Sequence, residues 1–99
     1  MIEERLLAAK QYVKTLFADR ADGHDVEHTL RVYTNAMRIA QAEGSCDLEI
    51  VGLSALLHDA DDYKLFQTEN NANARMFLEE IGTPKNQIEQ ICRVINAVS

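Results

Sequence analysis

The chain has 99 residues, of which 46% are hydrophobic and 26% are charged, and its formal net charge is -6. These values fit one ordinary globular domain and exclude a disordered or low-complexity chain. The 10 basic residues are scattered among 16 acidic ones, which argues against binding to a nucleic-acid polymer. No apolar stretch has the length of a membrane span, and the start of the chain lacks the apolar run of a signal peptide. We therefore expect a cytoplasmic protein without a membrane partner.

The residue types also favour an all-α fold. One proline and four glycines leave long uninterrupted runs in which helices are favoured. The two cysteines, Cys46 and Cys92, fit neither a disulfide framework nor a zinc ribbon, so we expect two reduced thiols. We expect a single helical domain over residues 1–99.

Apolar residues recur every three or four positions and predict five helices. The first covers residues 2–17. The second covers about residues 26–43, with Asp25 as its cap and Gly44 at its end. On this second helix His28 lies at the edge of a broad apolar arc, and Arg31 lies beside it toward the polar side. The arc also includes Leu30, Val32, Tyr33, Ala36, Met37, Ile39 and Ala40.

The third helix is predicted to be the central one. Asp47 caps it, it runs to about residue 60, and it carries no charge between residues 50 and 57. A helix that is apolar on every side is buried on nearly every side. Gly52, Ser54 and Ala55 are small enough to let neighbouring helices approach this helix closely.

Two further helices complete the predicted bundle. The fourth follows a polar connection at residues 61–67, with Thr68 as its cap and Gly82 at its end. Thr83 and Pro84 mark the start of the fifth, as a capping hydroxyl and a proline in the first turn. Its apolar stripe is still in phase where the chain stops, which suggests a fragment or a face covered by a partner, such as a homodimer. The stripe consists of Ile88, Ile91, Cys92, Ile95 and Val98.

A histidine and an aspartate, His58 and Asp59, end the apolar run of the third helix. Both are costly to bury unless hydrogen-bond partners or a metal ion offset their lost hydration. Adjacent side chains on a helix point about 100° apart, so a ligand at the helix end is able to meet both. For His58 alone, a hydrogen-bonded core histidine and a metal ligand are equally open.

The other two histidines, His24 and His28, lie at the start of the second helix. A short turn at residues 44–46 packs the second and third helices antiparallel and so brings His28 near His58 and Asp59. The acidic run at residues 59–62 is unfavourable at a helix C-terminus, which indicates an offsetting cation, although a solvated helix end is the alternative. His24, just before Asp25, is either a further ligand, a residue on the substrate side or simply a loop residue.

Two segments resemble those of the HD-domain metal-dependent phosphohydrolases. They are GHDVEHTLRV at residues 23–32 and LLHDADDYK at residues 56–64. The spacing between them and the helical character of the rest extend the resemblance over most of the chain, which is similar to the N-terminal part of such a domain. The paired segments carry this resemblance, because a bare His-Asp dipeptide is common.

The resemblance implies a divalent metal ion held by His28, His58 and Asp59, with Mn, Fe, Ni, Mg and Zn all open. In the family a further aspartate follows the helix that corresponds to residues 88–98, and this chain stops before reaching it. We therefore expect three of the four ligands here, with water or Asp62 completing the shell. The implied activity is hydrolysis of a nucleotide-like phosphoester or phosphoanhydride by metal-activated water.

Four residues are candidates for catalytic roles around such an ion. Arg31 and Lys64 are placed as phosphate clamps, with an exposed helix charge and a solvated loop lysine as the alternatives. Asp62 or His24 would orient the water or protonate the leaving group. A different class of function also stays open, namely a non-catalytic helical module that binds metal weakly or pairs with a partner chain.

Overall fold

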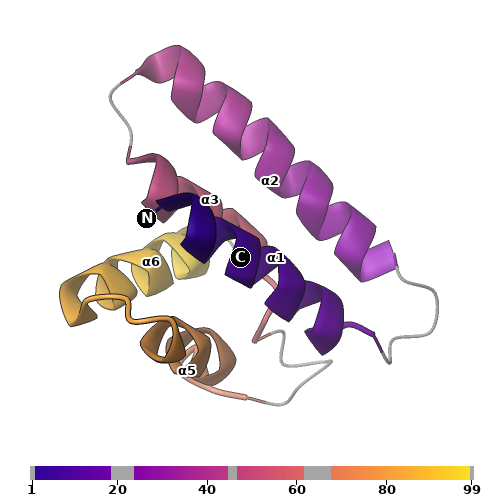
Figure 1. Cartoon of the computed structure of the whole chain (residues 1–99), viewed down its shortest axis with the longest axis vertical. Coiled ribbons are helices and arrows are strands. Elements are labelled where there is room, and N and C mark those ends of the chain that lie inside the picture. Colours follow the sequence, from indigo (N-terminus) through magenta and orange to yellow (C-terminus); the bar gives the residue numbers. More distant parts are fainter. Residues whose placement is uncertain (1, 19–23, 45–46, 62–67, 99) are drawn as a thin grey trace.

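The computed structural model describes residues 2–18, 24–44, 47–61 and 68–98, and the side chains of residues 4–18, 26–44, 47–61 and 68–97. These residues form helices and no strand, which confirms the predicted all-α fold (Figure 1). The helices are α1 (Ile2–Leu16), α2 (His24–Glu43), α3 (Leu48–Leu57), α5 (Ala72–Glu80) and α6 (Lys85–Val98).

Helix α3 is the centre of the bundle, as predicted. It contacts α1, α2 and α6, and in Figure 1 it runs alongside α2 and behind α1. All of residues 52–57 are buried. A Cβ atom added to Gly52 would lie 2.6 Å from Leu6 Cδ2 of α1 and 3.2 Å from Tyr33 Cε1 of α2. The missing side chain at Gly52 is therefore what lets both neighbouring helices approach α3.

Gly44, after α2, and Asp47, before α3, follow the predicted signals. Gly44 has φ +76°, a left-handed conformation that costs glycine little, and its N–H donates to the Ala40 carbonyl. The Asp47 carboxylate then accepts from the backbone N–H groups of Glu49 at 3.0 Å and Ile50 at 3.2 Å, which confirms it as the cap of α3. Helices α2 and α3 are antiparallel neighbours (Figure 1).

Two predicted helix ends near the histidines were wrong. Helix α2 begins at His24, so Asp25 lies within its first turn and not at its cap. Helix α3 ends at Leu57, about three residues early, and a turn follows at residues 58–61. Because His58 and Asp59 lie in this turn, the angle between neighbouring side chains of a regular helix does not fix their directions.

Thr68 does not cap the fourth helix, contrary to the prediction. Its hydroxyl donates instead to Asp61 Oδ1 at 2.6 Å, and α5 begins four residues later. Asp61 caps the first turn of α5 instead, because its carboxylate accepts from the backbone N–H groups of Asn73 and Ala74. A residue on a separate turn has taken over the capping role, which local sequence signals cannot reveal.

The predicted start of the fifth helix is half right. Helix α6 begins directly after Pro84, whose carbonyl accepts from the Ile88 N–H at 3.0 Å. The Thr83 hydroxyl, however, is buried without a hydrogen bond among the described residues, so it does not cap the helix. The stop at Gly82, with φ +79°, is confirmed.

The apolar stripe of α6 faces the interior of this chain. Its members Ile88, Ile91, Cys92 and Ile95 are all buried, in contact with the rest of the core. The side chain of Val98, the fifth member, lies outside the described residues, and a homodimer through the last helix stays a prediction. Among the described helices, none combines the length and apolar character that crossing a membrane would require.

Helix α2 buries a narrower face than the predicted arc. Ala40 is buried and Tyr33 and Met37 pack against the core, but the Ile39 side chain is 66% exposed. Ile39 lies on the same side of α2 as Val32 and Ala36, and no described helix covers that side at Ile39. The reason is that α2 is flanked mainly by α3, with few contacts to α1, so only one stripe of it is covered.

Candidate metal centre

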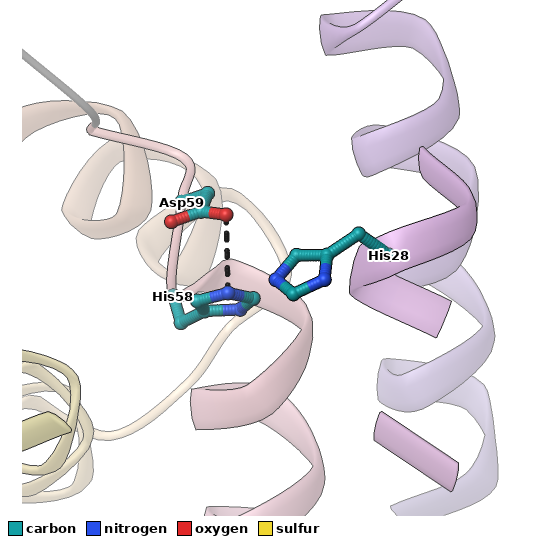
Figure 2. A group of neighbouring side chains, drawn as sticks. All are labelled: His28, His58 and Asp59. Atoms are coloured by element: carbon teal, nitrogen blue, oxygen red, sulfur yellow. Dashed lines mark ion pairs between the residues drawn. The ribbon is translucent and has the colours of Figure 1, made fainter. Parts of the chain in front are cut away.

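Three side chains that could hold a metal ion lie together at one end of the α2–α3 pair. They are His28 of α2 and His58 and Asp59 of the turn after α3, and Figure 2 shows all three pointing toward one another. Each offers a ligand atom, and these atoms lie within 4.8 Å of one another. The antiparallel packing of α2 and α3 brings the start of one helix beside the end of the other, as the sequence predicted.

Each ring nitrogen of His58 faces an oxygen atom. Its Nδ1 lies 2.7 Å from the carbonyl oxygen of Ala55, one turn earlier on α3. A carbonyl only accepts, so Nδ1 carries the hydrogen and donates it. The other nitrogen, Nε2, lies 3.1 Å from Asp59 Oδ2 (Figure 2). The backbone of α3 therefore selects the tautomer whose Nε2 lone pair faces Asp59 and His28.

The pair formed by His58 and Asp59 requires a positive charge between its atoms. In neutral imidazole, Nε2 is an acceptor like the carboxylate oxygen that it faces, so the contact is favourable only with a proton or a cation there. Accordingly, the hydrogen bond to Asp59 raises the pKa of His58, although burial opposes the shift. The same bond lowers the pKa of Asp59, again against burial.

These residues suit a divalent cation in donor type and in spacing. Imidazole nitrogen and carboxylate oxygen are ligands for Mn, Fe, Ni and Zn. Two ligand atoms about 2.1 Å from one ion and at right angles are about 3 Å apart, close to the separation of His58 Nε2 and Asp59 Oδ2. His28 is exposed, and its ring centroid lies 5.6 Å from that of His58.

The family model described as HD domain matches residues 25–98 of this chain. The chain belongs to the HD-domain family. The matched residues include all three members of the His28–His58–Asp59 group, and membership places the chain in a superfamily of metal-dependent phosphohydrolases. Comparisons with curated proteins and with solved structures gave no significant match.

The other predicted residues of this HD domain are placed less completely. Arg31 is exposed on α2, one turn after His28, and none of the described residues forms an ion pair with it. His24 is the first residue of α2, but its side chain lies outside the described residues, as do Asp62 and Lys64 entirely. Of the predicted residues, the structure thus brings together the three candidate metal ligands and places Arg31 one turn after His28 on the same helix.

A cavity beside the metal group was not predicted from the sequence. It has a volume of about 350 Å³, lies between α2, α3 and α6, and has the His58 side chain in its wall. Ser54 also lines it, 3% exposed, with a hydroxyl that has no hydrogen-bond partner among the described residues. A lone serine in the apolar core helix was the available signal. The other residues that line this cavity are apolar: Val32, Ala36, Val51, Ala55 and Val94.

Proposed function

We propose that this HD domain is a metal-dependent phosphohydrolase that acts on a small phosphoester or phosphoanhydride. The observation that carries the proposal is the convergence of His28, His58 and Asp59 in a chain of this family. Two imidazoles and one carboxylate give a donor set that holds a divalent ion and leaves further positions for water and phosphate oxygens. When bound, such an ion stabilises phosphate charge and lowers the pKa of its water, which supplies a nucleophile near neutral pH.

Other functions at the site, namely orienting the ligands, holding the phosphate and moving protons, are assigned to residues of the chain. His58 is held in one tautomer by the Ala55 carbonyl, so its Nε2 is oriented toward the ion before binding. Arg31, exposed on α2 one turn after His28, is proposed to hold a non-bridging phosphate oxygen through its guanidinium. Lys64 is proposed as a second clamp, and Asp62 or His24 as the group that orients water or protonates the leaving group.

The cavity beside His58 is proposed to receive the organic part of the substrate. A volume of about 350 Å³ is in the range of small-molecule sites, and its wall is apolar apart from His58 and Ser54. Such a wall suits the flat apolar face of a base, and the Ser54 hydroxyl, without a partner among the described residues, is available for one hydrogen bond. This supports a nucleotide-like substrate without deciding which one.

A phosphatase assay tests the proposal. The purified chain is stripped with a chelator, reloaded with Mn, Fe, Ni, Mg or Zn, and assayed for phosphate release from nucleoside mono-, di- and triphosphates and from p-nitrophenyl phosphate. We expect activity that depends on one or more of these ions. His58→Ala should abolish it, whereas Glu89→Gln, which affects an ion pair with Arg75 between α6 and α5, should not.

The outcomes separate the proposed enzyme from a non-catalytic module. Ion-dependent hydrolysis that disappears in His58→Ala supports the enzyme. Tight ion binding without hydrolysis of any of these esters would contradict it and favour a metal-binding module. Hydrolysis that survives in His58→Ala would show that the activity does not come from this site.

A further inference from the structure

Asp61, two residues after the last proposed metal ligand, makes three hydrogen bonds to the segment that begins α5. Its Oδ1 accepts from the Thr68 hydroxyl at 2.6 Å and from the Asn73 N–H at 2.7 Å. Its Oδ2 accepts from the Ala74 N–H at 3.0 Å. Both carboxylate oxygens are therefore occupied within the fold.

These bonds replace a cap that α5 lacks locally. Asn71 at the N-cap position has a left-handed backbone, with φ 58°, and makes no capping hydrogen bond through its side chain. The first N–H groups of a helix need acceptors, and a carboxylate there also interacts favourably with the positive end of the helix dipole. Asp61 meets both requirements from the turn that follows α3.

The preceding residue is tied to the same helix. The Asn73 side-chain amide donates to the Ala60 carbonyl at 2.8 Å, and Ala60 is buried. Two consecutive residues after Asp59 are thus bonded to the start of α5. The hydrogen bond from His58 Nδ1 to Ala55 anchors the other side of the turn.

We infer that Asp61 is a positioning residue for the metal centre. By fixing the turn at residues 58–61 to α5, it holds the Asp59 carboxylate opposite His58 Nε2. Asp61 is not part of the group of ligand atoms formed by His28, His58 and Asp59, and its oxygens accept from three donors of the fold instead. The inference rests on the proposed function only in assuming that His28, His58 and Asp59 hold an ion.

The test uses Asp61→Asn, which keeps the shape of the side chain but turns one oxygen into a donor that faces backbone N–H groups. We expect the affinity for Mn²⁺, measured by electron paramagnetic resonance of the free ion, to fall by about 10- to 100-fold, as for other groups that orient ligands. The visible absorption of the Co²⁺-loaded chain should also change in position or intensity, which a merely structural role would not produce.

Three further variants keep the test decisive. Thr68→Val and Asn73→Ala each remove one bond of the network, and each should lower Mn²⁺ affinity by several-fold even if Asp61→Asn does not fold. Ile91→Val, which trims the buried core of α6, should lower stability but leave Mn²⁺ affinity and the Co²⁺ spectrum unchanged. Losses of affinity in the network variants that are absent in Ile91→Val would support the inference.

Results that contradict the role of Asp61 can be distinguished from results that contradict the metal centre. If the unmodified chain binds Mn²⁺ and the network variants bind it equally tightly with an unchanged Co²⁺ spectrum, the role assigned to Asp61 is overturned and the metal centre stands. If the unmodified chain binds no divalent ion, both the metal centre and the role of Asp61 are overturned.

Discussion

His58 Nε2 lies 3.1 Å from Asp59 Oδ2, while Nδ1 of the same ring donates to the Ala55 carbonyl. The carbonyl fixes which nitrogen carries hydrogen, so Nε2 is the atom available to a cation. The two residues are neighbours in sequence, yet they face each other because α3 ends at Leu57 and a turn follows. This pair therefore titrates as a unit and would give up its shared proton when a metal ion binds.

Replacing the carboxylate should lower the pKa of His58 in the metal-free chain. In Asp59→Asn the charged acceptor that raises this pKa is gone, while burial, which lowers it, stays. An NMR titration of the imidazole protons measures the change. Glu89→Gln, remote on α6, serves as the control and should leave the titration unchanged. An unaltered His58 pKa in Asp59→Asn would contradict the pairing.

The same pair gives the metal-free chain a pH-dependent stability. The pKa of His58 is raised from 6.5, so its contribution is complete below pH 6.5 and is lost as pH rises through the folded-state pKa. The pKa of Asp59 is lowered from 3.8, so its contribution is complete above pH 3.8 and is lost as pH falls through the folded-state pKa. The difference in unfolding free energy between the native chain and Asp59→Asn should therefore be largest between these two values. A difference that does not vary with pH would contradict this account.

Protons should compete with a metal ion for His58 at a higher pH than they would for a histidine with an ordinary pKa. Because the pKa of His58 is raised, its Nε2 is still protonated above pH 6.5, and an ion must displace that proton. We expect the apparent Mn²⁺ affinity to decline as pH falls through the raised pKa, with protons released on binding. Calorimetry in buffers of different ionisation enthalpy measures that release. Binding without proton release at pH 6.5 would be inconsistent with His58 as a ligand.

Metal binding should stabilise the fold. Because His28 is exposed, its removal tests this effect on Tm without disturbing the packing of the core. At about 100 times its Kd an ion adds about 2.7 kcal/mol, which for a domain of this size raises Tm by roughly 10 °C or more. His28→Ala should lose this increase yet keep the metal-free Tm nearly unchanged, since His28 is exposed. Asn35→Ala, also exposed on α2, is the matched control and should keep the increase. Equal increases in both variants would exclude His28 as a ligand.

Gly52→Ala should destabilise the bundle although alanine is the better helix former. The added Cβ would lie 2.6 Å from Leu6 Cδ2 and 3.2 Å from Tyr33 Cε1, so these side chains or the helices that carry them must shift. Overpacking of this kind costs about 1–3 kcal/mol, which outweighs a gain of roughly 1 kcal/mol in helix propensity. Urea unfolding measures the balance. A more stable variant would show that the neighbouring side chains move away freely.

The helices were predictable because their signals are local. The repeat of apolar residues fixed the number and order of the described helices, and the glycines and Asp47 fixed three of their ends. The ends that were wrong depend on distant residues. Thr68 is of a residue type that often caps a helix. The packing of the chain, however, brings Asp61 to the start of α5, and Asp61 takes that role.

The metal group was predictable for a different reason. Antiparallel packing of α2 and α3 across a short turn is enough to bring His28 to His58, and the resemblance to the HD domain pointed to the same residues. The cavity beside His58 was not predictable, because its walls come from three helices whose faces have no distinctive composition. A lone serine in the apolar core helix was the one signal available in the sequence, and the structure then places the unpartnered Ser54 hydroxyl in that wall.

Isothermal titration of the chelator-stripped chain with Mn²⁺ tests the central claim most directly. The account predicts about one ion per chain, with affinity reduced by more than about 100-fold in each of His28→Ala, His58→Ala and Asp59→Ala, since loss of a ligand exceeds the cost of losing a supporting group. Asn35→Ala should bind as the native chain does. Absence of binding, or binding that survives all three ligand substitutions, would contradict the metal centre.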